Sequence, residues 1–137
     1  MKYVKTFKLF EIYKIENHKK AIRENNISYF DENRDYEKGD NILLILATIY
    51  GRIEIVKKLV NLVDVNQTNH LNRTAAYYTN NLDILFILLE NGLNFDHEDD
   101  HNELFLHYFD DDKKEIIYKS NEYKKYLRNK KAKEFNL

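Results

Sequence analysis

Apolar residues in the middle of the chain form short clusters at helical spacing, separated by polar stretches without periodicity. The segment from Ile53 to Leu62 places its apolar residues on one stripe and its charged residues on the other, which predicts an amphipathic helix. The segment from Leu82 to Glu90 predicts a second helix of this kind. A shorter apolar segment precedes each of them, Ile42 to Tyr50 and Thr74 to Tyr78, so the pattern predicts two pairs of helices.

Both longer helices lead into a similar polar link. Residues 64–66 (Asp-Val-Asn) follow the first helix, and residues 94–96 (Asn-Phe-Asp) follow the second, thirty residues later. Gly92 stands where the second helix must end, because glycine adopts the left-handed backbone of a helix stop without strain. The same succession of helix and polar link, recurring at a period of roughly 20 to 50 residues, is typical of stacked repeats. We therefore predict an all-α solenoid of stacked antiparallel helix pairs.

The two units resemble the ankyrin repeat, whose pattern leads from a loop through a short and a longer helix to a Gly-Ala-Asp-Val-Asn end. Residues 51–60 are similar to the middle of that pattern and residues 64–66 to its end. Residues 72–77 and 88–95 resemble the start and the end of the next unit, and residues 102–107 resemble the start of a third. The chain departs from the family because it contains no proline and because the first helix of the second unit is short. The resemblance implies an ankyrin-repeat solenoid with irregular N-terminal and C-terminal helical caps.

The length of 137 residues fits one domain with a continuous core. Near the N-terminus, Asn17 is suited to cap a helix, and we expect His18 to lie on the polar face of that helix. The polar C-terminal helices suit the end of a stack, where only one side has a neighbour. The expected parts are an N-terminal helical cap (1–38), two repeats (39–68 and 69–98), and a partial repeat with a C-terminal helical cap (99–137).

Composition excludes several kinds of protein. The formal net charge of -1 gives the whole molecule no strong field, and the absence of cysteine excludes disulfides and zinc-thiolate sites. The first residues lack the apolar run of a signal peptide, and the longest apolar stretch is far too short for a membrane span. We therefore expect a cytoplasmic protein without membrane contact.

Sequence patterns typical of enzymes are missing. The chain has no phosphate-binding Gly-rich loop, no nucleophile elbow, and no serine beside a recognisable base. The histidines and aspartates of residues 97–101 are metal-ligating types, but they lack a signature that would hold them in a fixed arrangement. We therefore expect no enzymatic activity, no cofactor, no metal site and no small-molecule substrate.

Ankyrin domains bind protein partners with their loop tips and the adjoining faces of their short helices, so the resemblance implies the same here. A rigid aromatic side chain in such a place supplies much of the energy of an interface. Tyr50 and Tyr78 could instead cover the core, as aromatic residues at helical spacing often do. The corresponding positions are Ile49, Tyr50 and Tyr78 on the short helices, His70, Leu71 and Arg73 in the first loop, and Asp99, Asp100, His101 and Glu103 in the second.

Charge is segregated towards the C-terminus. Residues 96–112 contain eight Asp and Glu and no Lys or Arg, whereas residues 113–133 contain nine Lys and Arg. An acidic loop could attract a basic partner by electrostatic steering. Residues 110–112 also suit the positive end of a helix dipole, and the lysines could simply keep the helix surface soluble. The acidic residues near position 100 have no such explanation, because no helix is expected to start there.

A small binding module acts by occupying or masking its partner. Small ankyrin proteins in bacteria are frequently immunity proteins that block secreted toxins, so the resemblance implies a non-enzymatic inhibitor whose protein partner is a basic toxin or effector. Two alternatives stay open. One is a nucleic-acid or ribonucleoprotein binder acting through the lysine- and tyrosine-rich tail, which the neighbouring acidic residues disfavour. The other is a host-directed ankyrin adaptor.

Overall fold

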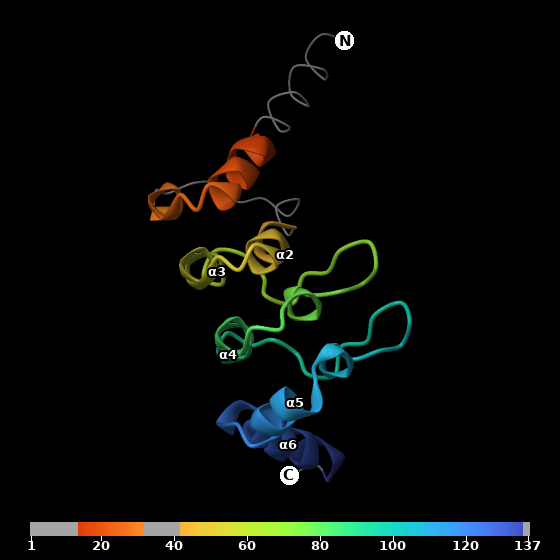
Figure 1. Cartoon of the computed structure of the whole chain (residues 1–137). Helices are drawn as coiled ribbons and strands as arrows, with labels where there is room; N and C mark the ends of the chain where they lie inside the picture. The colour runs from red at the N-terminus through yellow and green to blue at the C-terminus, as the bar shows by residue number, and fades with distance from the viewer. Residues whose placement is uncertain (1–13, 32–41, 136–137) are drawn as a thin grey trace.

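The computed structural model describes residues 14–31 and 42–135, and this part of the chain is all-α, as the sequence predicts (Figure 1). The described residues contain no strand and a single isolated bridge, between Glu98 and Leu104. None of their helices is long and apolar enough to cross a membrane. The elements are a helix at residues 14–23, η1 (Ile27–Asp31), α2 (Ile42–Ile49), α3 (Ile53–Leu59), η3 (Ala75–Tyr78), α4 (Leu82–Glu90), η4 (Phe105–Tyr108), α5 (Asp111–Tyr118) and α6 (Asn121–Glu134).

The helices lie in two layers, and two long loops extend from one of them. Helix α2 packs against α3 and η3, α3 packs against α4, and η3 packs against η4. Figure 1 shows α3 and α4 one above the other, with α2, η3 and η4 beside them and both loops directed to the same side. Helices α5 and α6 close the C-terminal end, where α6 contacts α4.

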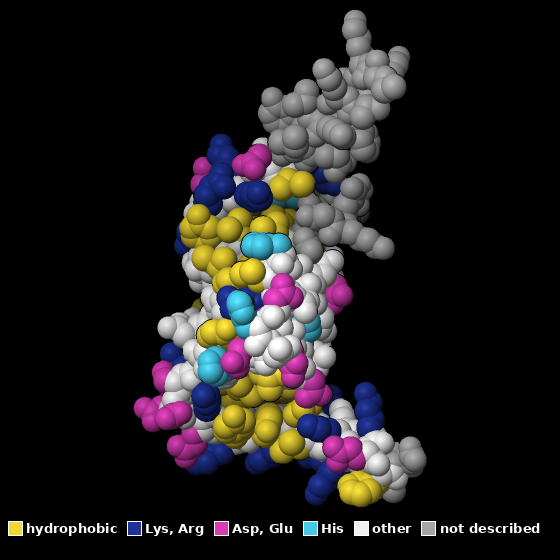
Figure 2. Space-filling view, turned by 90° about the vertical axis from the view of Figure 1, so that its right-hand side faces the viewer, with side chains coloured by type: hydrophobic (Ala, Val, Ile, Leu, Met, Phe, Trp, Pro, Cys, Tyr) yellow, Lys and Arg dark blue, Asp and Glu magenta, His cyan; other side chains and the backbone are white. Residues whose placement is uncertain are grey.

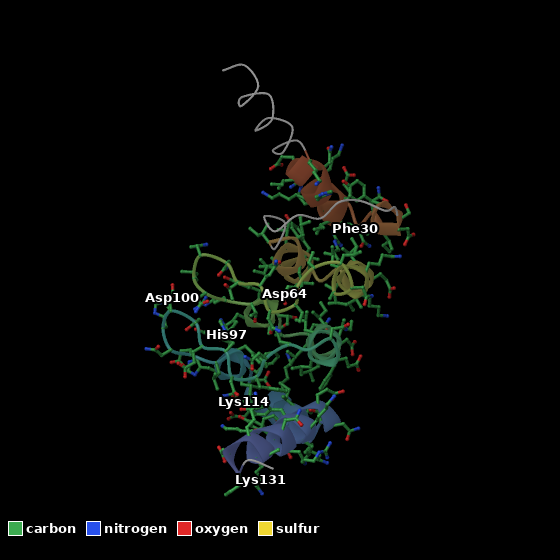
Figure 3. The ribbon with its side chains drawn as sticks, turned by 180° about the vertical axis from the view of Figure 1, so that it is seen from behind. Phe30, Asp64, His97, Asp100, Lys114 and Lys131 are labelled. Atoms are coloured by element: carbon green, nitrogen blue, oxygen red, sulfur yellow. The ribbon has the colours of Figure 1, made fainter. Side chains whose placement is uncertain are left out.

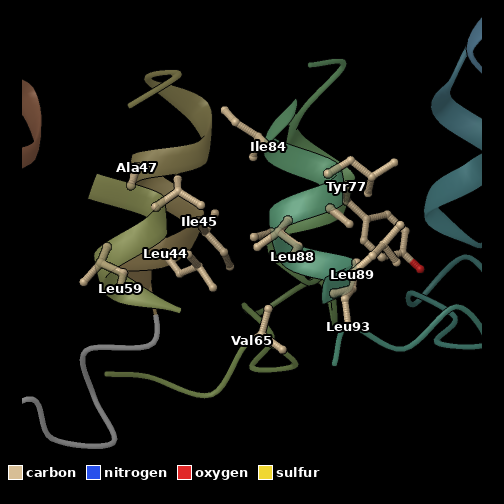
Figure 4. Packing of buried hydrophobic residues seen from close by; sticks show 14 of the residues in the cluster. Leu44, Ile45, Ala47, Leu59, Val65, Tyr77, Ile84, Leu88, Leu89 and Leu93 are labelled. Carbon is tan, nitrogen blue, oxygen red and sulfur yellow. The ribbon is translucent and has the colours of Figure 1, made fainter. Parts of the chain in front are cut away.

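A continuous apolar core joins these layers. Leu44 and Ile45 of α2 and Leu59 of α3 are buried on one side, and Ile84 and Leu88 of α4 are fully buried on the other (Figure 4). Each such side chain stabilises the fold by about 1.5 to 3 kcal/mol when it leaves water. The stripes that predicted the helices are thus the surfaces along which the helices pack.

Side chains and glycine fix the helix ends. The Asn81 side chain accepts hydrogen bonds from the Asp83 and Ile84 amides at the start of α4, 2.9 and 3.4 Å away. Gly92 has φ +94° directly after α4, in the left-handed conformation that the sequence predicts for this helix stop. Helix α4 has the predicted bounds, whereas α3 ends at Leu59, three residues earlier than expected, because residues 60–62 continue as turns.

The N-terminal region corrects two expectations. The helix at residues 14–23 runs through Asn17, so Asn17 does not begin a helix there. His18 is buried with 2% of its surface exposed, and its Nδ1 lies 2.7 Å from the Tyr29 hydroxyl. A polar hydrogen-bond partner eleven residues away is what allows this side chain to leave water. Much of the expected N-terminal cap and the first three residues of the first expected repeat lie outside the described residues.

Candidate functional site

The two loops, residues 64–73 (the first loop) and 94–103 (the second loop), are shaped by the same kind of hydrogen bond. In the first loop, Asn69 Oδ1 accepts from the amides of Leu71 and Arg73, at 3.0 and 3.1 Å. Thirty residues later, Asp99 Oδ1 accepts from the amides of His101 and Glu103, at 2.9 and 3.0 Å. These are Asx turns, in which a short polar side chain replaces a backbone acceptor. Both loops therefore contain the same hydrogen-bonded Asx turn, hereafter the loop frame.

Left-handed residues complete both frames. Asn72 has φ +58° and Asn102 has φ +60°, again thirty residues apart. Asparagine tolerates this conformation better than other residues with a side chain, because its short amide forms local hydrogen bonds. The tip of each loop is thus set by an Asx residue and by an asparagine three positions later.

Hydrogen bonds tie the two loops to each other. The Asn66 side chain donates to the Gly92 carbonyl at 2.9 Å and accepts from the Asn94 amide at 2.8 Å. Nearer the tips, His97 Nε2 lies 2.7 Å from the Asn72 carbonyl. The Asp100 amide donates to the Leu71 carbonyl at 3.2 Å. The loops therefore form one surface, hereafter the loop face, and Figure 3 shows Asp100 at its outer edge and His97 closer to the helices.

Arg73 and Asp99 form an ion pair between the two loops. Arg73 Nε donates to Asp99 Oδ2 at 2.9 Å, and the Asp99 side chain is fully buried. The Tyr108 hydroxyl accepts from Arg73 Nη2 at 2.9 Å and lies 3.4 Å from Asp99 Oδ2. Burial favours the neutral carboxyl, but hydrogen bonds from the Glu103 amide, Arg73 and the His101 amide outweigh it and lower the pKa of Asp99 to about 2.

Tyr77 closes the base of the second loop. Its hydroxyl lies 2.7 Å from the carbonyl oxygens of both His97 and Glu103. Burial, followed by the nearby charge of Asp99, raises the pKa of Tyr77 to about 12. No sequence pattern singled out Tyr77, which follows two buried alanines in η3. Tyr77 holds the loop and is not itself a surface residue.

The predicted binding residues differ in how accessible they are. Ile49 and Tyr50 at the end of α2 are 54% and 44% exposed. Tyr78 is half-buried and packs against the core, which favours the core-covering alternative for this side chain. The structure brings the loop residues together, whereas Ile49 and Tyr50 lie at the end of α2 and not in either loop. Of the loop residues, His70, Asp100 and His101 are exposed, Leu71, Arg73 and Glu103 are half-buried, and Asp99 is buried.

The loop face is rich in carboxylates and histidines. Figure 2 shows Asp, Glu and His side chains gathered over the loops. Arg73 is the only Lys or Arg from residue 59 to residue 112 of the sequence, and its guanidinium is paired with Asp99. The remaining carboxylates of the two loops therefore give the face a negative charge when the histidines are neutral; they are Asp64, Asp96, Glu98, Asp100 and Glu103.

The C-terminal helix uses its aromatic side chains for packing. The rings of Tyr123 and Tyr126 lie 5.4 and 4.9 Å from the ring of Phe95 at the start of the second loop. The Tyr126 hydroxyl bonds Asp96, and burial together with this carboxylate raises the pKa of Tyr126 to about 12. An open groove of about 850 Å³ lies beside these contacts, and its lining includes Glu90 of α4, Asn94 of the second loop, and Lys125 and Lys130 of α6.

The described residues contain no group of three or more His, Asp or Glu side chains placed to hold a metal ion. The Asp99 carboxylate is already occupied by two amides and Arg73. Comparison of the chain with family models, with curated proteins and with solved structures gives no match in any of the three searches. The case for a function therefore rests on the geometry of the loop face.

Proposed function

We propose that this protein is a non-enzymatic binding module, built as a short ankyrin-like stack, that masks a basic protein partner such as a toxin or effector with its loop face. One observation carries the proposal: two loops with the same frame are joined into a single surface on which the only cation is already paired. The charge of such a surface suits a partner of opposite sign.

The support for an ankyrin-like stack is the correspondence between structural features that lie thirty residues apart. Helix η3 corresponds to η4, each a single turn following a loop. The Asx turn at Asn69 corresponds to that at Asp99, and the left-handed Asn72 corresponds to Asn102. Stacked units place equivalent residues in register, which is how the Asn66 side chain reaches the backbone of the next loop.

Electrostatics favours a basic protein as the partner. Like-signed carboxylates on one face attract a cationic surface over a Debye length of about 8 Å at physiological salt and raise the association rate. The loop frame positions these carboxylates before a protein partner binds, so little ordering is needed on binding. A binding face that occupies a basic surface inhibits whatever that surface does, and this is the role that we propose for the protein.

The test is charge reversal with a matched control. The partner is captured on the immobilised protein, identified and purified, and its affinity is then measured by surface plasmon resonance. We expect Glu98→Lys with Asp100→Lys to weaken binding by about tenfold or more, mainly through a slower association rate. The control, Glu54→Lys with Glu90→Lys, makes the same change of charge at exposed sites of α3 and α4. Equal effects of the two double variants would overturn the proposal.

Nucleic-acid binding through the tail is the competing hypothesis, and the packing of α6 argues against it. Stacking on bases requires free aromatic faces. Tyr123 and Tyr126 pack on Phe95, which leaves Tyr118 as the more exposed tyrosine of the tail. Binding that is lost when the chain is truncated after Asp112, but that survives reversal of the loop carboxylates, would favour the tail instead.

A further inference from the structure

The loop face contains most of the histidines of the protein. The chain has five histidines, of which three lie on the loop face and a fourth lies on η4 beside it. His70 is at the tip of the first loop, His97 and His101 are in the second loop, and His107 is on η4, directly after that loop. The hydrogen bond between the Asp100 amide and the Leu71 carbonyl brings the two tips together.

These histidines are distributed among the carboxylates that carry the negative charge. His107 Nδ1 lies 3.4 Å from Glu103 Oε2, and the two side chains are 58% and 41% exposed. His97 bonds the Asn72 carbonyl, and its ring meets the Tyr77 ring edge-on at 6.3 Å. The charged and titratable groups of the same loops and of the neighbouring turns are Asp64 and Arg73 of the first loop, Asp96, Glu98, Asp99, Asp100 and Glu103 of the second, Tyr77 and Tyr78 of η3, and Tyr108 of η4.

We propose that protonation of these histidines removes most of the negative charge of the loop face, so that a basic partner is released as the pH falls from about 7.5 to about 5.5. This inference rests on the binding face proposed above. Arg73 cancels Asp99, so neutral histidines leave the other loop carboxylates uncompensated, namely Asp64, Asp96, Glu98, Asp100 and Glu103. Carboxylates ordinarily stay ionised at pH 5.5, whereas histidine ordinarily gains its charge in this interval.

The expected size of the effect follows from Coulomb's law. One added charge roughly 8 Å from a cation of the partner weakens binding by about twofold in water at low salt. Three or four such charges acting together weaken it by about tenfold. The effect should shrink at high salt, because these side chains are exposed to solvent and screened.

The test uses a defined basic probe, a fluorescein-labelled oligolysine peptide, whose binding is followed by fluorescence anisotropy at low salt. The wild-type protein is compared at pH 7.5 and pH 5.5 with the triple variant His70→Gln, His101→Gln and His107→Gln. His97 is kept, because its ring bonds the first loop. Far-UV circular dichroism at both pH values shows that the two proteins stay folded, and buried His18 is common to both.

The wild-type protein should bind the probe about tenfold more weakly at pH 5.5, and the triple variant should change by less than about threefold. An equal loss of affinity in both proteins, or no loss in either, overturns the pH-dependent release while leaving the binding face intact. Absence of binding by the wild-type protein at pH 7.5 overturns the basic-partner face itself, and the pH-dependent release with it.

Discussion

Single Asx side chains determine the shape of both loops. Asn69 and Asp99 occupy equivalent places and accept the same pair of amides, so the turn does not require a charge. The charge of Asp99 has a separate use, because it binds Arg73 across the gap between the loops. One residue thus shapes its own loop and joins it to the other.

Because of the charge of Asp99, the stability of the protein should fall at low pH. Its pKa is lowered from 3.8 to about 2 in the folded state, so the unfolded chain takes up this proton more readily. The stability contributed by Asp99 is therefore complete above pH 3.8 or so and is lost as the pH falls towards 2. Asp99→Asn keeps the Asx turn and removes the charge. Urea unfolding between pH 2 and pH 4, roughly, should show a smaller loss of stability for the variant than for the wild-type protein; parallel curves would contradict this assignment.

The left-handed conformation of Asn102 predicts that alanine and glycine at this position affect stability differently. Asn102→Ala should lower the free energy of unfolding by about 1 kcal/mol, because alanine pays a steric cost at φ +60°. Asn102→Gly, the matched control, should cost nothing, since glycine adopts this conformation freely. Thermal unfolding by circular dichroism measures both variants. A glycine variant as destabilised as the alanine variant would show that the amide side chain, and not the backbone, is what matters.

The longer helices could be predicted from the sequence because their own residues determine where each helix forms and ends. Helix α4 has an apolar stripe, a capping asparagine and a stop glycine, and its predicted bounds are confirmed. The end of α3 lacks such a glycine, and the prediction extended it three residues too far. Helix α6 has no fully buried residue of its own, so its position depends on contacts that no local pattern reveals.

The attachment of α6 should depend on its tyrosines. Tyr126→Ala removes the ring that lies 4.9 Å from Phe95 and the hydrogen bond to Asp96, and it should lower the free energy of unfolding by about 1 to 2 kcal/mol. Leu127→Ala, one residue on, should cost less than about 0.5 kcal/mol because Leu127 is 42% exposed. Urea unfolding compares the two. Similar losses would mean that α6 is not held through Tyr126.

Across the whole molecule, the sequence indicated which candidate residues lie in loops but not how deeply each of them is buried. Asp99 was expected among the exposed acids, and it is buried because Arg73, twenty-six residues earlier, supplies the opposite charge. His18 is buried for a similar reason, through Tyr29. Such pairings join distant parts of the chain, so they cannot be predicted from helix propensity or from the periodicity of apolar residues. The charge of the face was visible in the sequence because it depends on residue type alone.

Hydrogen exchange of the complex tests the central claim most directly, namely that both loops bind the partner as one surface. The chain contains no proline, so every loop amide can report. With the captured partner bound, exchange should slow together in residues 66–73 and 96–103 and stay unchanged in the exposed parts of α3. Slower exchange confined to residues 111–134, with both loops exchanging as in the free protein, would contradict the account.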